Sequence, residues 1–260
     1  MHAGYHIVKR TKKLCPVFLA IFFAYAFCIP LFDSQQAKAI EEGGVRLQQL
    51  APFEARPHAL RRLAWEIRRR TSVDTHPEPR KVHLSDPALF DSLFLYWPGE
   101  GPFEPLPSKE ISQLRRFLTL GGLLLVDDAK GDGVFANSVR RELAKVLPQS
   151  KFEYISNRHT LYHSYYILDR PVGRIEGPPH LEAIFIDGRL AVILSVHDLG
   201  GAWARDPVGG WLYPVEPGGE TQREMAIRLG VNIVLYALCL DYKDDQVHAP
   251  FIMRRRRGQP

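Results

Sequence analysis

An apolar run that ends in two carboxylates carries the clearest chemical signal in this sequence. Residues 123–128 read LLLVDD, and the loop KGDG at 130–133 follows before a new helical pattern begins. A buried parallel strand delivers its last side chains in this way to the carboxyl edge of an α/β sheet, where such folds keep their sites. Carboxylates there could perform acid–base catalysis or bind a metal ion. No Cys or Ser stands at that point, so the sequence does not indicate familiar nucleophilic chemistry.

The two carboxylates cannot both face one site. Asp127 and Asp128 are neighbours on a strand, so their side chains start toward opposite faces of the sheet. We expect Asp128 to accept backbone N–H groups at the start of the next helix, and a direct functional role is the alternative. The loop at 130–133 is a weak match to a phosphate cradle, because carboxylates surround it and neither a GxGxxG nor a Walker pattern is present.

Two further segments bring histidines near predicted strand ends. His197 and Asp198 precede a glycine-rich loop that leads to Trp203, and this segment fits the rim of a ligand site and simple packing equally well. His159 and His163 have the spacing of zinc ligands on a helix, but the HExxH order is missing and the segment reads as extended. We therefore favour a packed, hydrogen-bonded His163 over a ligand or base, and we assign no metal site.

These segments define the candidate site. The candidate binding residues are Asp127, Asp128, His159, His163, Tyr165, His197, Asp198 and Trp203, and the candidate catalytic residues are Asp128, His163 and His197.

Alternating helical and strand patterns position these residues, and such alternation is typical of an α/β fold. Expected strands cover 45–50, 81–84, 93–97, 123–126, 152–155, 183–186 and 190–196, and expected helices begin near 57, 108, 135 and 220. Asp187-Gly188 suits a type I′ hairpin turn between the last two strands. The sequence predicts a single flavodoxin-like (Rossmann-type) α/β domain, with a mostly parallel sheet, helices on both faces and an added antiparallel hairpin.

The first 39 residues have the pattern of a secretory signal peptide. Four basic residues between positions 9 and 13 precede an apolar stretch over 14–32, and Ala37-Lys38-Ala39 follows as an A-x-A ending. We expect cleavage near Ala39 and a periplasmic or secreted protein, and the alternative is an uncleaved segment that anchors the chain to the inner membrane. The expected organisation is a signal peptide or anchor at 1–39, one α/β domain at 40–242 and a basic flexible tail at 243–260.

Charge and cysteine content exclude several classes of function. The chain has 34 basic and 29 acidic residues, of which five basic and one acidic residue precede position 40, so 29 and 28 remain. A nearly neutral domain lacks the global field of a nucleic-acid-binding protein. Only Cys239 remains after the leader, so neither an internal disulfide nor a cysteine metal cage can form.

Taken in order along the chain, several motifs resemble a bacterial family, the domain-of-unknown-function (DUF) 4159 family. These motifs are LSDPALF at 84–90, GGLLLVDD at 121–128, the segment 159–165, DGRL at 187–190, HDLG at 197–200 and RLGVN at 228–232, within roughly 45–242. The resemblance implies a flavodoxin-like sheet similar to that of class I glutamine amidotransferases. It also implies an exported or membrane-associated protein, often encoded near MoxR-type ATPases and von Willebrand A-domain membrane proteins. Where the amidotransferases carry their nucleophilic Cys, this chain has Asp127-Asp128-Ala129, so their activity does not carry over.

Two functions from different classes fit these observations. The favoured one is a binding module of the bacterial envelope, without an expected cofactor, that recognises a protein or a glycan through aromatic loops at the carboxyl edge. The same resemblance implies that its partners would be membrane or envelope proteins of a MoxR and von Willebrand A-type system. The alternative is a metal-assisted or carboxylate-assisted hydrolase that uses Asp128, His163 and His197.

Overall fold

The computed structural model describes the backbone of residues 44–256 and the side chains as far as Cys239. The expected leader at 1–39 lies outside the described residues. Among the described residues, no helix combines the length and apolar character that crossing a bilayer requires.

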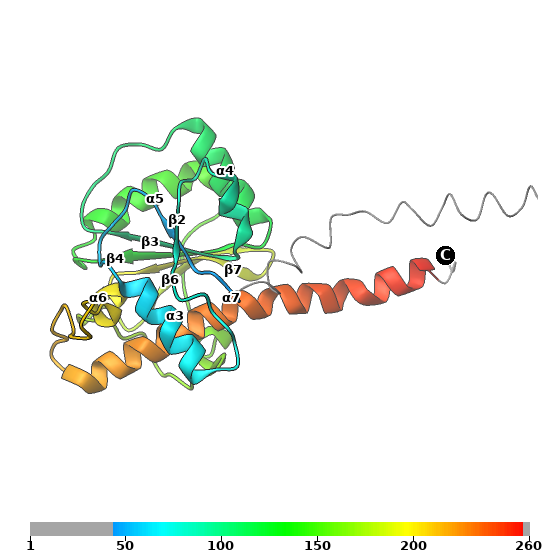
Figure 1. Cartoon of the computed structure of the whole chain (residues 1–260). Coiled ribbons are helices and arrows are strands. Elements are labelled where there is room, and N and C mark those ends of the chain that lie inside the picture. The colour runs from blue at the N-terminus through cyan, green and yellow to red at the C-terminus, as the bar shows by residue number, and fades with distance from the viewer. Residues whose placement is uncertain (1–43, 257–260) are drawn as a thin grey trace, which may run out of the picture. The chain divides into compact units, whose positions relative to one another are not determined.

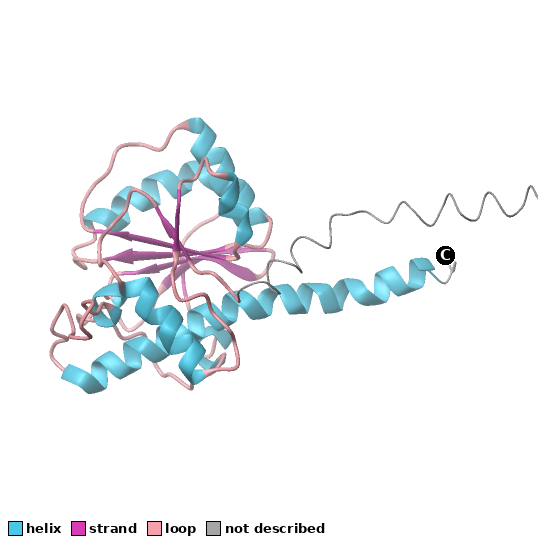
Figure 2. Cartoon of the chain, viewed as in Figure 1, coloured by secondary structure: helices cyan, strands magenta, loops and turns pink. Residues whose placement is uncertain are grey.

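One seven-stranded sheet forms the centre of the domain (Figures 1 and 2). The strands are β1 (Gln48–Leu50), β2 (Arg80–Val82), β3 (Phe94–Gly99), β4 (Leu123–Asp128), β5 (Glu153–Tyr154), β6 (Glu182–Ile186) and β7 (Arg189–Ser195), in the order β2-β1-β3-β4-β7-β6-β5. The first five in that order are parallel, and β6 and β5 add an antiparallel edge. If β7 is counted as the fifth parallel strand, the parallel part has the flavodoxin-like order 2-1-3-4-5, which agrees with the predicted α/β fold.

Helices cover both faces of this sheet (Figure 1). The helices are α3 (Ala59–Arg70), α4 (Ser108–Thr119), α5 (Val134–Val146), α6 (Leu199–Trp203) and α7 (Gly219–Arg256), and the short 3₁₀ turns are η1 (Pro87–Asp91) and η2 (Thr160–His163). α4 and α5 pack on one face, and α3, α6 and α7 pack on the other.

Alternating residues of β3 and β4 enter the two cores in turn. Leu123 and Leu125 pack with α3, α6 and α7, whereas Leu124 and Val126 pack with α4 and α5. This alternation follows from the two-residue repeat of a strand. It also decides that Asp127 and Asp128 point into different halves of the molecule, as the sequence predicted.

The predicted hairpin turn is confirmed, and one boundary differs. Asp187 and Gly188 have φ angles of 50° and 81°, which a type I′ turn requires. Gly121, just beyond α4, has a φ angle of 111°, a positive value that suits a glycine after the end of a helix. α7, however, continues to Arg256 and so runs through most of the segment expected to be a flexible tail at 243–260.

Asp128 fixes the connection between β4 and α5. Its fully buried carboxylate accepts hydrogen bonds from the backbone N–H groups of Lys130, Gly131, Gly133 and Ala136 at 3.0 to 3.3 Å. The carboxylate thereby satisfies donors of the loop and of the first turn of α5 that have no intrahelical partner. Asp128 has the capping role that the sequence favoured.

We expect Asp128→Ala to lower the free energy of unfolding by about 2 kcal/mol or more, because several buried N–H groups lose their acceptor together. The matched control is Asp132→Ala, since exposed Asp132 accepts, within the described part of the chain, a single hydrogen bond from the N–H of Val134. Urea unfolding measures both changes. Equal losses in the two variants would contradict the capping role of Asp128.

Candidate functional site

A hollow of about 510 Å³ opens at the carboxyl edge of the sheet, between the loops that follow β1 and β3. Its walls are residues 52–57, residues 98–103, Phe135 and Tyr213. β2 lies on one side of β1 in the sheet and β3 lies on the other, so the direction of the strand order reverses between β1 and β3. Ligands of open α/β sheets bind at such a switch point, which makes this hollow the leading candidate site.

Arg56 holds the wall of the hollow together. Its Nε donates to Asp198 Oδ1 at 2.7 Å, one terminal nitrogen donates to Glu100 Oε1 at 2.6 Å, and the other donates to the carbonyl of Ala129 at 2.5 Å. The guanidinium also lies over the ring of Tyr213, with its central carbon 4.5 Å from the ring centre. Arg56, in the loop after β1, therefore contacts the loops that follow β3, β4, β7 and α6.

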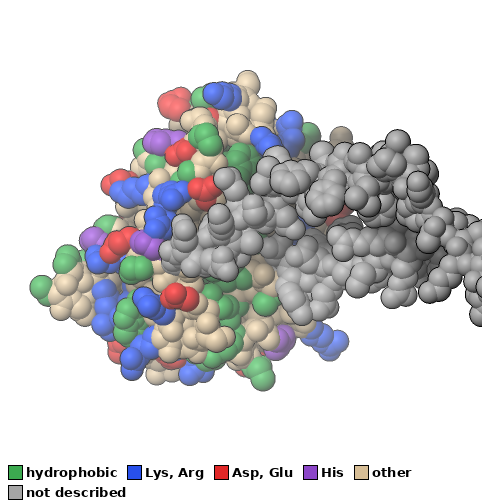
Figure 3. Space-filling view, turned by 45° about the vertical axis from the view of Figure 1, so that its right-hand side comes forward, with side chains coloured by type: hydrophobic (Ala, Val, Ile, Leu, Met, Phe, Trp, Pro, Cys, Tyr) green, Lys and Arg blue, Asp and Glu red, His purple; other side chains and the backbone are tan. Residues whose placement is uncertain are grey.

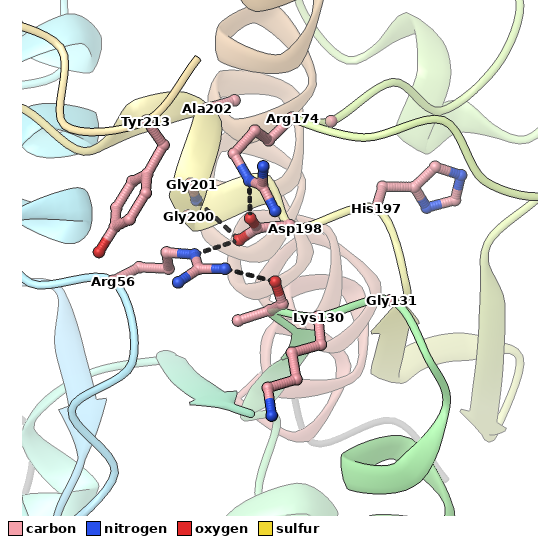
Figure 4. A network of polar contacts seen from close by, with 12 residues as sticks. Arg56, Lys130, Gly131, Arg174, His197, Asp198, Gly200, Gly201, Ala202 and Tyr213 are labelled. Carbon is pink, nitrogen blue, oxygen red and sulfur yellow. Dashed lines mark hydrogen bonds and ion pairs between the residues drawn. The ribbon is translucent and has the colours of Figure 1, made fainter. Parts of the chain in front are cut away.

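Asp198 is the buried partner of two arginines (Figure 4). Its side chain has no exposed surface, one carboxylate oxygen accepts from Arg56 and the backbone N–H of Gly201, and the other accepts from Arg174 Nε. Two guanidinium groups compensate the charge that burial would otherwise penalise heavily.

The backbone is strained where this ion pair forms. Arg56 and Asp198 have φ angles of 61° and 52°, which non-glycine residues rarely adopt. Such strain persists only where the surrounding contacts hold it in place, and it is frequent at functional sites. Gly201 fits beneath the pair because a Cβ there would lie 2.3 Å from Asp198 Oδ2.

Asp127 lies directly beneath this network and has no exposed surface. Its carboxylate accepts from the backbone N–H groups of Leu199 and Gly200 at 2.9 and 2.7 Å and from the hydroxyl of Tyr96 at 2.9 Å. Burial, followed by the charge of Asp198, raises the pKa of Asp127 to about 7. The carboxylate fastens β4 to the start of α6 and does not line the hollow.

His197 points away from the arginine pair (Figure 4). Its buried ring lies with Nε2 2.8 Å from the carbonyl of Pro178 and Nδ1 3.4 Å from Ser195 Oγ. Burial is the main cause that lowers its pKa. His197 borders a second hollow, of about 360 Å³, beneath residues 169–177 and the start of α7.

The structure separates the other predicted residues from the carboxyl edge. The imidazole of His159 packs on Tyr236 of α7, and His163 is exposed beside His159 with its Nδ1 3.3 Å from the His159 carbonyl. The hydroxyl of Tyr165 donates to the carbonyl of Arg70, which ends α3. His163 therefore does not meet Asp128 or His197, and these three do not form one site. Among the described residues, no group of three or more His, Cys, Asp or Glu side chains could hold a metal ion.

Trp203 is a core residue, not the ligand anchor that the sequence suggested. Its side chain has no exposed surface, and its indole N–H donates to the carbonyl of Ala226 at 2.9 Å. Its ring lies against Gly230 of α7, where an added Cβ would come within 2.7 Å of it. A partner molecule cannot reach this ring in the folded domain.

Sequence reasoning missed the charged residues of this site. Arg56 and Glu100, which line the hollow, and Arg174, which pairs with Asp198, lie in loops of ordinary composition and belong to no motif. The switch-point rule could have drawn attention to the loops after the first and third strands, because both sequence positions were known. It could not have selected Arg56, since its partner Asp198 is 142 residues away.

Comparison with known protein families assigns the chain to a family. Residues 45–238 match the model of the family described as Domain of unknown function (DUF4159), and the chain belongs to this family. A search of curated proteins finds no match.

We expect Arg56→Ala to lower the free energy of unfolding by about 3 kcal/mol, because it leaves the buried charge of Asp198 with only one of its two arginine partners. Arg61→Ala is the control, since Arg61 and its partner Glu78 are both more than half exposed. That control should change stability by less than about 0.5 kcal/mol. A loss as small for Arg56→Ala as for Arg61→Ala in urea unfolding would rule out a central role for the pair.

The raised pKa of Asp127 predicts a pH dependence. Between about pH 4, where an unfolded Asp titrates, and about pH 7, the folded protein binds more protons than the unfolded chain. Stability from this group therefore falls as the pH rises through that window, by up to about 1.4 kcal/mol per unit. Asp127→Asn removes the titration, so the stability advantage of the native protein over this variant should be larger at pH 5 than at pH 8. A constant difference in urea unfolding at the two pH values would refute the assignment.

Proposed function

We propose that the protein is a binding module of the bacterial envelope that lacks amidotransferase activity, and that its ligand, a protein segment or a glycan, enters the switch-point hollow. The main support is that the hollow lies at the switch point and contains a polar side chain in a fixed orientation. This side chain is Arg56, which is buried and donates hydrogen bonds to three partners. Preorganised anchors of this kind lower the entropic cost of binding.

The chemistry of the walls supports recognition of a partly apolar ligand with polar groups. Phe53 and Phe103 pack edge to face, with ring centres 5.2 Å apart, and they are half-buried. Tyr213 presents a second aromatic surface beside Arg56. Glu100, with 47% of its side chain exposed, supplies a carboxylate at the rim. Aromatic walls with a few polar groups are typical of ligand sites and of interface anchors.

The residues at the end of β4 support a function without amidotransferase chemistry. A carboxylate side chain cannot replace the thiolate of a nucleophilic Cys. Asp127 and Asp128 are also occupied by hydrogen bonds from the surrounding backbone. The hydrolase alternative gains no support from the geometry, because Asp128, His163 and His197 point to separate places.

Export and envelope partners belong to the same proposal. The leader-like pattern at 1–39 supports translocation of the domain. Side chains of both charges are interspersed on the face that Figure 3 presents, which supports specific contacts over a broad electrostatic attraction. Proteins of a MoxR and von Willebrand A-type system are the partners that we infer from the family resemblance.

We expect Tyr213→Ala and Phe103→Ala to weaken ligand binding about tenfold or more, because aromatic anchors dominate such sites. The test measures binding of the full chain to arrays of cell-wall glycans and of peptides from envelope proteins. Tyr154→Ala is the control, since Tyr154 is 69% exposed on β5 at the sheet edge. The proposal would be overturned if ligands bound Tyr213→Ala and Phe103→Ala as tightly as the native protein. It would also be overturned if the native protein bound to neither array.

A further inference from the structure

A cluster of arginines and tryptophans lies beside the switch-point hollow and is not part of it. Arg205 and Arg223 both lie over the ring of Trp211, with their guanidinium carbons 3.8 and 4.1 Å from the ring centre. Arg62 of α3 lies 4.0 Å from the ring centre of Trp65 and 5.6 Å from that of Trp211. The cluster thus joins the outer side of α3 to the loop at 204–213.

Positive charge in this cluster exceeds the negative charge that faces it. Arg62 pairs with Glu66, but Arg70 takes the other oxygen of the same carboxylate at 2.6 Å. Arg223 pairs with Glu220 at 3.0 Å. The side chain of Arg205 has neither a hydrogen bond nor an ion pair with any residue that the structure describes. Its positive charge, after burial, is among the causes that lower the pKa of Arg62.

Two donors in the cluster also lack acceptors. The Nε atoms of Arg62 and Arg205 are buried and have no hydrogen-bond partner among the described residues. A buried donor without an acceptor costs free energy, and two guanidinium groups held close together repel each other. An anion bound between the two side chains would relieve the repulsion.

We propose that Arg62 and Arg205 bind a phosphate group, and that Trp65, which is 44% exposed, packs against the organic part that carries it. Phosphate suits the pair because a monoester carries close to two negative charges and three acceptor oxygens, enough for two guanidinium forks. The stacked rings hold the forks in place, so little side-chain freedom is lost on binding.

This site is independent of the proposed function. Neither Arg62, Trp65 nor Arg205 lines the hollow. The two sites share only the loop at 204–213, which contributes Tyr213 to the hollow and Arg205 to the cluster.

The experiment measures binding of inorganic phosphate and phenyl phosphate to the full chain by calorimetry and tryptophan fluorescence. We expect Arg205→Ala to weaken both ligands at least tenfold and Arg205→Lys to weaken them severalfold, because lysine keeps the charge and loses the fork. Trp65→Ala should weaken phenyl phosphate more than inorganic phosphate, because it removes the ring for the organic part and also frees Arg62 from its stack. Arg158→Ala, which removes an exposed arginine from the loop before η2, should leave both affinities unchanged.

A parallel measurement with vesicles identifies the source of the phosphate. Vesicles of phosphatidylcholine with phosphatidic acid, whose headgroup is a phosphate monoester, test a lipid headgroup, and phosphatidylcholine vesicles are the reference. If the native protein binds the mixed vesicles, and Arg205→Ala and Arg205→Lys both weaken that binding, the ligand is a lipid headgroup. If the native protein binds the soluble ligands alone, the ligand is a free phosphate ester. No binding of any probe, or equal losses in Arg205→Ala and Arg158→Ala, overturns the proposal. Unfolding curves of each variant confirm that the fold is intact.

Discussion

The buried carboxylate of Asp198 is the interaction on which the carboxyl edge of this domain depends. Transfer of an ionised carboxylate out of water is costly, and here Arg56 and Arg174 offset that cost from opposite directions. Arg56 in turn orients the carbonyl of Ala129 and the rim residue Glu100. One ion pair thus sets the positions of the loops after β1, β3, β4 and β7, and with them the shape of the hollow.

The same edge of the sheet carries two acidic residues at the end of β4, and hydrogen bonds within the fold occupy both of them. Asp127 fastens α6 to the sheet, and Asp128 fastens the loop before α5. Both carboxylates are buried and accept hydrogen bonds from backbone N–H groups. The hollow that we propose as the binding site lies at the switch point, where the walls come from loops and not from the end of β4.

Local patterns were sufficient to predict most of the sheet and were insufficient for the site. The apolar run at 123–126 and the Asp187-Gly188 turn determine their conformations from nearby residues, and both predictions are confirmed. Sequence could not tell that the chain turns back along α7 after β5, which carries His163 away from the carboxyl edge. Nor could it tell a buried Trp203 from an exposed one, because the burial of this ring depends on its packing against Gly230 of α7. The Arg56–Asp198 pair joins distant parts of the chain, and no local signal marks it.

The most direct test of this account is a double-mutant cycle between Arg56 and Asp198 on the free energy of unfolding. Arg56→Met, Asp198→Asn and the double variant remove the two charges singly and together while preserving much of the side-chain volume. Because the two charges stabilise each other, we expect the double variant to lose less stability than the sum of the single losses, with a coupling of about 1.5 kcal/mol or more. Additive losses, within about 0.5 kcal/mol, would show that the two residues do not act as a unit and would contradict the central claim.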